Sequence, residues 1–142
     1  ITACTDITGF GLIGHAMEMA SSSQVTFEID VHKVPYIDGA LDMAKMGLVP
    51  AGTYNNKNYI ENDVYSENIE ECFIDALYDP QTSGGLLITL PESKVENIMK
   101  DFANKNMDTK VAVIGKVIEK QEKSIILLLQ NSLKQCLYLV LL

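Results

Sequence analysis

The sequence predicts an α+β domain in which helices pack on a mixed β-sheet. Hydrophobic residues make up 47% of the 142 residues and charged residues 21%, which is typical of a globular domain with one core. Hydrophobic side chains recur at helical spacing in some segments and alternate or run continuously in others, as in strands. We therefore expect one domain over 1–129, without internal repeats, and an apolar tail of uncertain origin over 130–142.

The opening segment, 3–15, places a carboxylate, hydroxyl groups and glycines ahead of an apolar helix predicted over about 9–21. Asp6 and Thr8 can each cap this helix by accepting hydrogen bonds from backbone N–H groups. Glycine lets the backbone approach a ligand closely, and a helix N-terminus attracts anions. The segment is a candidate binding loop, with the alternative that Asp6 is only a cap.

The next elements are a strand, a helix and a loop. Residues 25–30 alternate hydrophobic and polar side chains, which predicts a strand with one buried face. Asp38 is a candidate cap for a second helix, which Gly47 ends. Residues 48–66 show no sustained period and predict a long loop that forms part of the site wall. Surface packing is the expected use of its Tyr54 and Tyr59, with stacking on a base as the alternative.

The second half adds two helices and three strands. Asp79, Thr82 and Ser83 precede the first of these strands, and either hydrogen-bond their own turn or face a ligand. The predicted order is helix 67–77, buried strand 86–90, a helix beginning at 91, and strands 111–119 and 124–129, which are joined by 120–123.

A dinucleotide site is an alternative for the opening segment. Gly9-x-Gly11-x-x-Gly14 matches the dinucleotide-binding fingerprint, and Asp30 lies where a ribose-binding acid is expected. The fingerprint requires a buried parallel strand before its first glycine, whereas 5–8 are mostly polar. A nicotinamide-binding domain of an oxidoreductase is therefore the less favoured hypothesis.

The cysteines and histidines do not form a recognisable metal or disulfide set. Cys4, Cys72 and Cys136 are widely spaced, which suits the reducing cytoplasm better than a disulfide framework. We expect Cys4 to be a small buried thiol and His15 to pack on its helix, with the alternative that His15 faces the ligand loop. Tetrahedral zinc sites need closely spaced ligand pairs, which are absent from the sequence.

The formal charge of −8 argues against nucleic-acid binding, because phosphate contacts need clustered Lys and Arg. The tail is too short to span a membrane. An acidic domain that handles a nucleotide needs metal ions or a partner domain to supply positive charge. The chain starts at Ile1, and we interpret it as a piece of a longer polypeptide.

Two long motifs resemble one enzyme family. Residues 5–15 read Thr-Asp-Ile-Thr-Gly-Phe-Gly-Leu-Ile-Gly-His and resemble the motif that opens the carboxyl-terminal half of selenophosphate synthetases (selenide, water dikinases). Residues 78–87 read Tyr-Asp-Pro-Gln-Thr-Ser-Gly-Gly-Leu-Leu and resemble the second signature of that half. Residues 47–54 also resemble the family, although Ala51 replaces an expected glycine. The resemblance covers about 1–119.

The resemblance implies the fold of the carboxyl-terminal domain of aminoimidazole ribonucleotide synthetase. It further implies a cytoplasmic homodimer that converts selenide, ATP and water into selenophosphate, AMP and phosphate with Mg²⁺. The partner of this chain is then the amino-terminal half of the same enzyme, which mainly binds the ATP. A non-catalytic dimerisation module with the same fold remains a further hypothesis.

The same resemblance assigns candidate site residues. Asp6 matches the metal-binding acid of this half, whereas the nucleophile belongs to the missing half, so no catalytic residue is assigned here and Cys4 is not the nucleophile. The candidate cofactor-binding residues are Thr5, Thr8, Gly9, Gly11, Thr82, Ser83, Gly84 and Gly85.

Overall fold

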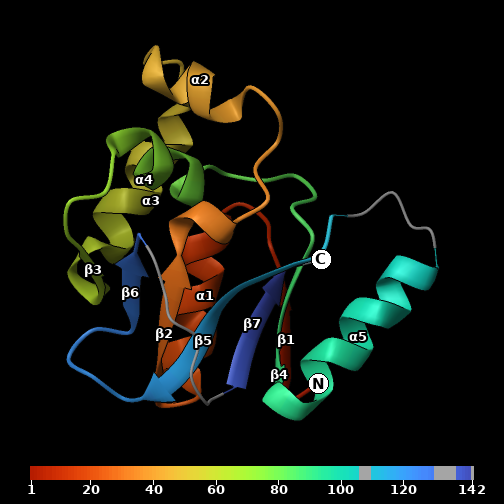
Figure 1. The fold of residues 1–142 in the computed structure, drawn as a ribbon. Helices are drawn as coiled ribbons and strands as arrows, with labels where there is room; N and C mark the ends of the chain where they lie inside the picture. The colour runs from red at the N-terminus through yellow and green to blue at the C-terminus, as the bar shows by residue number, and fades with distance from the viewer. Residues whose placement is uncertain (106–109, 130–136, 142) are drawn as a thin grey trace.

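The computed structural model describes residues 1–105, 110–129 and 137–141, the last as backbone only. A mixed seven-stranded sheet runs through these residues in the order β1-β4-β7-β5-β2-β6-β3, and helices pack against it (Figure 1). The predicted α+β class with a mixed sheet is confirmed.

The strands are β1 (Ala3–Asp6), β2 (Val25–Asp30), β3 (Val64–Ser66), β4 (Leu86–Pro91), β5 (Ala112–Glu119), β6 (Ile125–Leu128) and β7 (Leu137–Leu141). The helices are α1 (Gly11–Ser22), α2 (Ala40–Lys45), α3 (Ala51–Ile60), α4 (Glu71–Tyr78) and α5 (Glu92–Asn104), with short 3₁₀ turns η1 (Val31–Lys33) and η2 (Glu61–Asp63). β6 pairs in parallel with β2 and β3, and the other pairs are antiparallel.

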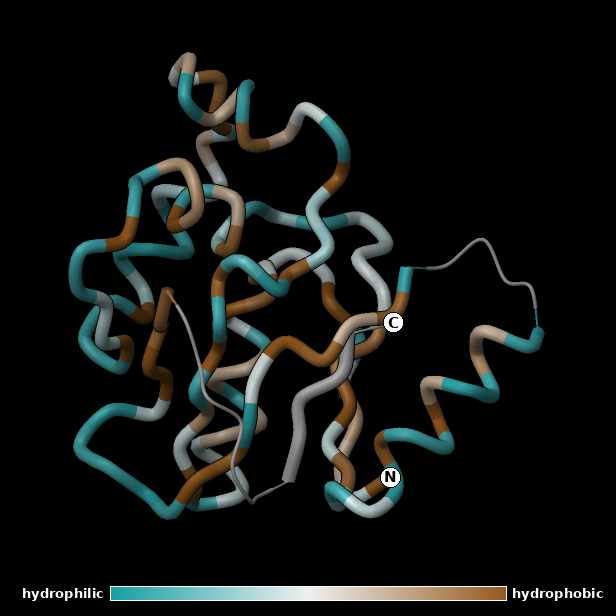
Figure 2. The backbone as a smooth tube through the Cα atoms, viewed as in Figure 1, coloured by the Kyte–Doolittle hydropathy of each residue, from teal (hydrophilic) through white to brown (hydrophobic). Residues whose placement is uncertain are grey.

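The main core lies between the sheet and α1. Ile13 and Ala16 of α1 are fully buried, as are Phe27 and Ile29 of β2, because the helical and strand periods bring their side chains to the same interface. Figure 2 shows hydrophobic residues along the central strands and hydrophilic ones in the loop that joins β5 to β6. This core fixes the N-terminal end of α1, where the opening segment lies.

A second, smaller cluster lies under α5. Ile88 and Leu90 of β4 pack with Val95, Ile98 and Met99 of α5, whereas Leu87 belongs to the main core. Because successive side chains of a strand point to opposite faces, α5 covers the face of β4 that α1 does not. Figure 1 shows α5 standing apart from the other helices.

The prediction of a long loop over 48–66 is wrong. This segment contains α3, η2 and β3. The buried side chains of α3 are Thr53, Asn56 and Ile60, which follow helical spacing, but two of them are polar. The hydrophobic pattern of a helix is therefore incomplete in this segment, and the sequence does not predict α3.

Residues 3–6 were expected to be part of a loop, and they form the edge strand β1, paired with β4. An edge strand has one neighbour and tolerates polar residues, which explains why a hydrophobic pattern did not reveal it.

Three further details differ from the predictions. The helix expected over 67–77 begins at Glu71, and the residue that precedes α2 is Gly39, so that Asp38 does not cap it. β2 buries both faces, because Thr26 and Asp30 are as enclosed as Phe27. Thr26 is hydrogen-bonded to the backbone of the turn between β5 and β6, and these two strands lie on either side of β2.

The backbone of 137–141 forms β7 between β4 and β5. Cys136 and the remainder of the tail over 130–136 lie outside the described residues, as does 142. Among the residues that are described, no helix is long and apolar enough to cross a membrane.

Candidate functional site

The two motifs that are separated by about seventy residues in sequence dock directly on each other. Backbone hydrogen bonds run from Ile7 N to Gly85 O and from Gly84 N to Ile7 O, each 2.9 Å long, and from Gln81 N to Thr8 O over 3.0 Å. These bonds continue the β1–β4 ladder, which ends with Asp6 opposite Leu86. The loop after β1 and the loop before β4 therefore form one structural unit.

Gly11 allows the closest approach between the motifs. Its φ is +71°, and a Cβ placed there would lie 2.8 Å from the carbonyl carbon of Tyr78 and 2.9 Å from the carbonyl oxygen of Asp79. Both atoms are backbone and cannot move aside like a flexible side chain. Gly11 is thus required by its conformation and by the space available.

Asn56 joins both motifs to α3. Its Nδ2 donates to the carbonyl oxygens of Gly9 and Tyr78, each over 2.9 Å, and the side chain is buried. Thr53, one helical turn earlier, donates to Asp79 Oδ1 over 3.3 Å. Neither residue was predicted from the sequence to support the site, although their spacing places them on one face of a helix.

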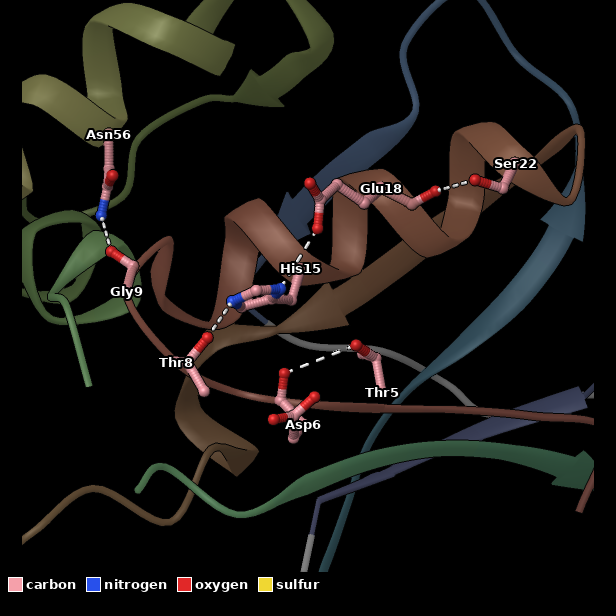
Figure 3. Close-up of polar contacts among 8 residues, drawn as sticks. All are labelled: Thr5, Asp6, Thr8, Gly9, His15, Glu18, Ser22 and Asn56. Carbon is pink, nitrogen blue, oxygen red and sulfur yellow. Dashed lines mark hydrogen bonds and ion pairs between the residues drawn. The ribbon is translucent and has the colours of Figure 1, made fainter. Parts of the chain in front are cut away.

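Thr8 contacts His15 of α1. Its Oγ1 lies 3.0 Å from His15 Nε2, and His15 Nδ1 lies 3.2 Å from Glu18 Oε2 (Figure 3). Phe10 meets the His15 ring edge-on at 5.7 Å. His15 therefore packs on its helix, as expected, and also faces the opening loop.

Asp6 is not a helix cap. Phe10 is the N-cap residue of α1, and neither Asp6 nor Thr8 makes a side-chain cap hydrogen bond. The Asp6 carboxylate is exposed at the end of β1, and no hydrogen bond or ion pair engages it within the described parts of the chain. The contact from Thr5 Oγ1 reaches the backbone oxygen of Asp6 (Figure 3). The carboxylate is thus available to a ligand.

Asp79 differs from Asp6, because both of its carboxylate oxygens are occupied within the protein. Thr53 donates to Oδ1, and Gln81 Nε2 donates to Oδ2 over 2.8 Å. Asp79 shapes its own turn, whereas Thr82 and Ser83 are exposed in it. Of the two acids in the motifs, Asp6 is the one whose carboxylate is open to a ligand.

An open groove of about 490 Å³ lies beside the docked loops. Most of its wall is hydrophobic and comes from residues 34–50 and from α4, whereas Ile7, Ser83 and Gly84 line the end nearest the motifs. Asp75 also lines the groove, but its carboxylate is 2.6 Å from Lys57 Nζ.

Lys57 ties α3 to α4 near this groove. Partial burial alone lowers the pKa of the Lys57 ammonium, but hydrogen bonds with Asp75 and Glu71 outweigh burial and raise the pKa above its ordinary value. The ammonium is therefore held charged in a paired state. Desolvation raises the pKa of the partly buried Tyr36 phenol, which also lines the groove, with smaller contributions from Cys72 and Asp30.

The described residues do not complete a metal site alone. No group of three or more His, Cys, Asp or Glu side chains that could hold a metal ion occurs among them. Mg²⁺ usually keeps several waters and takes one or two protein carboxylates together with phosphate oxygens. Asp6 fits the role of one such carboxylate.

Cys4, Cys72 and Tyr59 differ in their exposure to solvent. Cys4 is exposed, so the expected buried thiol is wrong; side chains alternate along a strand, and Cys4 shares the solvent-facing side of β1 with Asp6. Cys72 is buried. Tyr59 packs at the surface, stacked on Phe10 with ring centroids 6.0 Å apart.

The geometry gives no support for the dinucleotide alternative. β1, which precedes Gly9, is an edge strand paired antiparallel with β4 and is not adjacent to β2. Asp30 is buried, accepts from His32 N over 3.1 Å and lies 3.6 Å from Lys33 Nζ. Its carboxylate caps η1 and is not presented to a ribose.

Comparison with known proteins places these features in a family. The family described as AIR synthase related protein, C-terminal domain matches residues 1–128. The selenide, water dikinase of Caldanaerobacter subterraneus subsp. tengcongensis is 50% identical over 125 residues, which are 88% of this chain and 36% of that protein. The one from Clostridioides difficile is 49% identical over 129 residues, 90% of this chain and 37% of that protein.

A more distant relative, the selenide, water dikinase of Treponema denticola, is 40% identical over 126 residues, 87% of this chain and 36% of that protein. The chain thus spans little more than a third of the length of these relatives. The resemblance predicted from the two motifs is confirmed. The chain belongs to the family of AIR synthase related proteins, of which it is the C-terminal domain.

Proposed function

We propose that this chain is the carboxyl-terminal part of a selenide, water dikinase, which makes selenophosphate from selenide, ATP and water. The observation that carries the proposal is Asp6, an exposed carboxylate without a protein partner among the described residues, at the point where the two motifs dock. The relatives that bear the name selenide, water dikinase support it.

In this proposal Asp6 would supply one carboxylate ligand to a Mg²⁺ ion. Bound Mg²⁺ neutralises phosphate charge during phosphoryl transfer. The chain's own contribution is to hold Asp6 at a fixed position, which the backbone bonds of Ile7 and Thr8 to the second motif accomplish. The candidate binding residues Thr5, Thr8, Gly9, Gly11, Thr82, Ser83, Gly84 and Gly85 lie in or beside these two loops.

The other ligands and the nucleophile are assigned to the amino-terminal part of the same enzyme. A chain with a net charge of −8 holds a polyphosphate poorly unless cations or a partner domain supply positive charge. We infer a cytoplasmic homodimer in which the amino-terminal parts bind most of the ATP.

The test is Asp6→Asn in the full-length enzyme. Selenide-dependent ATP turnover should fall by about two orders of magnitude, because loss of a carboxylate ligand to the metal is worth several kcal/mol. The thermal unfolding temperature should stay the same, since the side chain is exposed. Asp38→Asn is the matched control, because the Asp38 side chain is 99% exposed and, among the residues that the structure describes, contacts only Lys110, at 3.4 Å. Activity of Asp6→Asn within about twofold of wild type would contradict a metal-binding role.

A further inference from the structure

Thr8, His15 and Glu18 form a hydrogen-bonded chain that the metal-binding proposal does not use. Thr8 Oγ1 is 3.0 Å from His15 Nε2, and His15 Nδ1 is 3.2 Å from Glu18 Oε2 (Figure 3). The His15 side chain is only 12% exposed, whereas Glu18 is 53% exposed. A hydroxyl, an imidazole and a carboxylate in this order are the arrangement by which enzymes fix the proton of a hydroxyl group.

The carboxylate determines which ring nitrogen carries the proton. An ionised Glu18 can only accept a hydrogen bond, so His15 Nδ1 must donate to it. In a neutral imidazole, Nε2 is then the acceptor, and the Thr8 hydroxyl donates a hydrogen bond to Nε2. The remaining lone pairs of Thr8 Oγ1 point away from the ring.

The backbone of Thr8 is fixed independently of His15. Its carbonyl oxygen accepts from Gly11 N and from Gln81 N, each over 3.0 Å. Only the side-chain torsion and the hydroxyl proton of Thr8 are left to be set, and His15 sets both. Phe10, with Tyr59 stacked on it, holds the ring from a further side.

We propose that His15 is a positioning residue for the phosphoryl-transfer site, which acts by orienting the Thr8 hydroxyl as a hydrogen-bond acceptor two residues beyond Asp6. The ligand of that oxygen is a hydrogen-bond donor, namely a metal-bound water or a protonated group of the substrate. This inference rests on the proposed function.

Kinetics of the full-length enzyme test the inference. His15→Ala should lower kcat for selenide-dependent ATP turnover by about 10- to 100-fold, as is typical for the loss of a supporting contact. His15→Gln should recover activity to within about threefold of wild type, because its amide oxygen can reach the position of Nε2 and accept from Thr8. His32→Gln is the matched control at the other histidine, which packs on Phe73 with ring centroids 4.8 Å apart.

A double variant separates positioning from a structural role. If His15 acts through Thr8, then Thr8→Val and the double variant T8V/H15A should have the same kcat, because the second change removes nothing further. Three results would each overturn the inference. These are a kcat of T8V/H15A reduced by the product of the two single losses, full activity of His15→Ala, and no recovery of activity in His15→Gln.

A spectroscopic readout keeps this test separate from that of the proposed function. In full-length enzyme with ¹⁵N-labelled histidine at about pH 8, where an ordinary histidine is neutral, His15 should show the Nδ1–H tautomer, and Thr8→Val should shift its Nε2 signal. The signal is assigned by its absence in His15→Gln. An Nε2–H tautomer would overturn the inference and leave the proposed function standing. Wild-type enzyme without selenide-dependent turnover would overturn the proposed function and, with it, the role of His15 in phosphoryl transfer.

Discussion

The amide of Asn56 donates to the carbonyl oxygen of Tyr78 over 2.9 Å, in a position where neither group reaches bulk water. The same amide group donates to Gly9 over 2.9 Å. One side chain on α3 therefore satisfies a backbone oxygen from each of the two docked motifs.

Asn56→Ala should reduce the free energy of unfolding by about 2–3 kcal/mol, because two hydrogen bonds are lost, and the buried carbonyl oxygen of Tyr78 and the partly buried one of Gly9 are left without that partner. Urea denaturation measures the effect. The matched control is Asn55→Ala, one residue earlier on the exposed side of α3, which should change stability by less than about 0.5 kcal/mol. Equal effects of the two variants would contradict the bridging role of Asn56.

Gly11→Ala should destabilise the protein by more than about 2 kcal/mol, because the added methyl group combines a strained φ with contact against the backbone of Tyr78 and Asp79. Gly85 has a φ of +90°, and Gly85→Ala should reduce the free energy of unfolding by more than about 1 kcal/mol. Gly9→Ala is the control, since no atom lies within 4 Å of the position that its added methyl group would take. Thermal unfolding measures the three stabilities, and the largest fall in unfolding temperature for Gly9→Ala would disprove this ranking.

Stability should fall at alkaline pH. Burial, with a smaller contribution from Glu61, raises the pKa of Tyr78 to about 12 from an ordinary value of 10.0. A group whose pKa is raised on folding stabilises the protein fully below its unfolded pKa, and this contribution is lost as the pH rises from about 10 to about 12. The loss should reach about 2–3 kcal/mol and be reduced in Tyr78→Phe. Urea denaturation across this range measures it, with Tyr54→Phe on the surface as the control.

The chain alone should fold and should not hydrolyse ATP. Its core is extensive, but Asp6 is a single carboxylate, and among the described residues there is no cluster of three metal-binding side chains. Isothermal titration with Mg-ATP and a phosphate-release assay on the purified chain check this. Tight binding, or turnover above a buffer blank, would mean that the nucleotide site lies in this part of the enzyme.

Much of the fold could be predicted, because α1, β2, β4 and β5 bury hydrophobic side chains, and α5 partly buries its own at helical spacing. Among the elements that were missed, β1 and α3 put polar side chains where hydrophobic ones are expected. In α3, Thr53 and Asn56 are buried because their partners are backbone oxygens and a carboxylate of the site. Because α3 supports the site through buried polar side chains, its sequence lacks the hydrophobic pattern by which a helix is predicted.

The candidate site was predicted in part. The motifs identified Asp6, Thr8 and the glycines, and the structure brings their two loops together. Asn56 and the pairing of Thr8 with His15 could not be predicted, because each depends on the angle at which α3 or α1 meets the loop, and sequence spacing contains no such information.

The docking of the two loops has a consequence for local opening. Loop amides usually exchange with solvent faster than those of helices and strands, but the N–H groups of Ile7, Gln81 and Gly84 are donors to the opposite motif. Exchange at any one of them requires separation of the loops, which also breaks the contacts of Asn56. The three amides should therefore open together, as one cooperative unit that links the carboxylate of Asp6 to the interior of the fold.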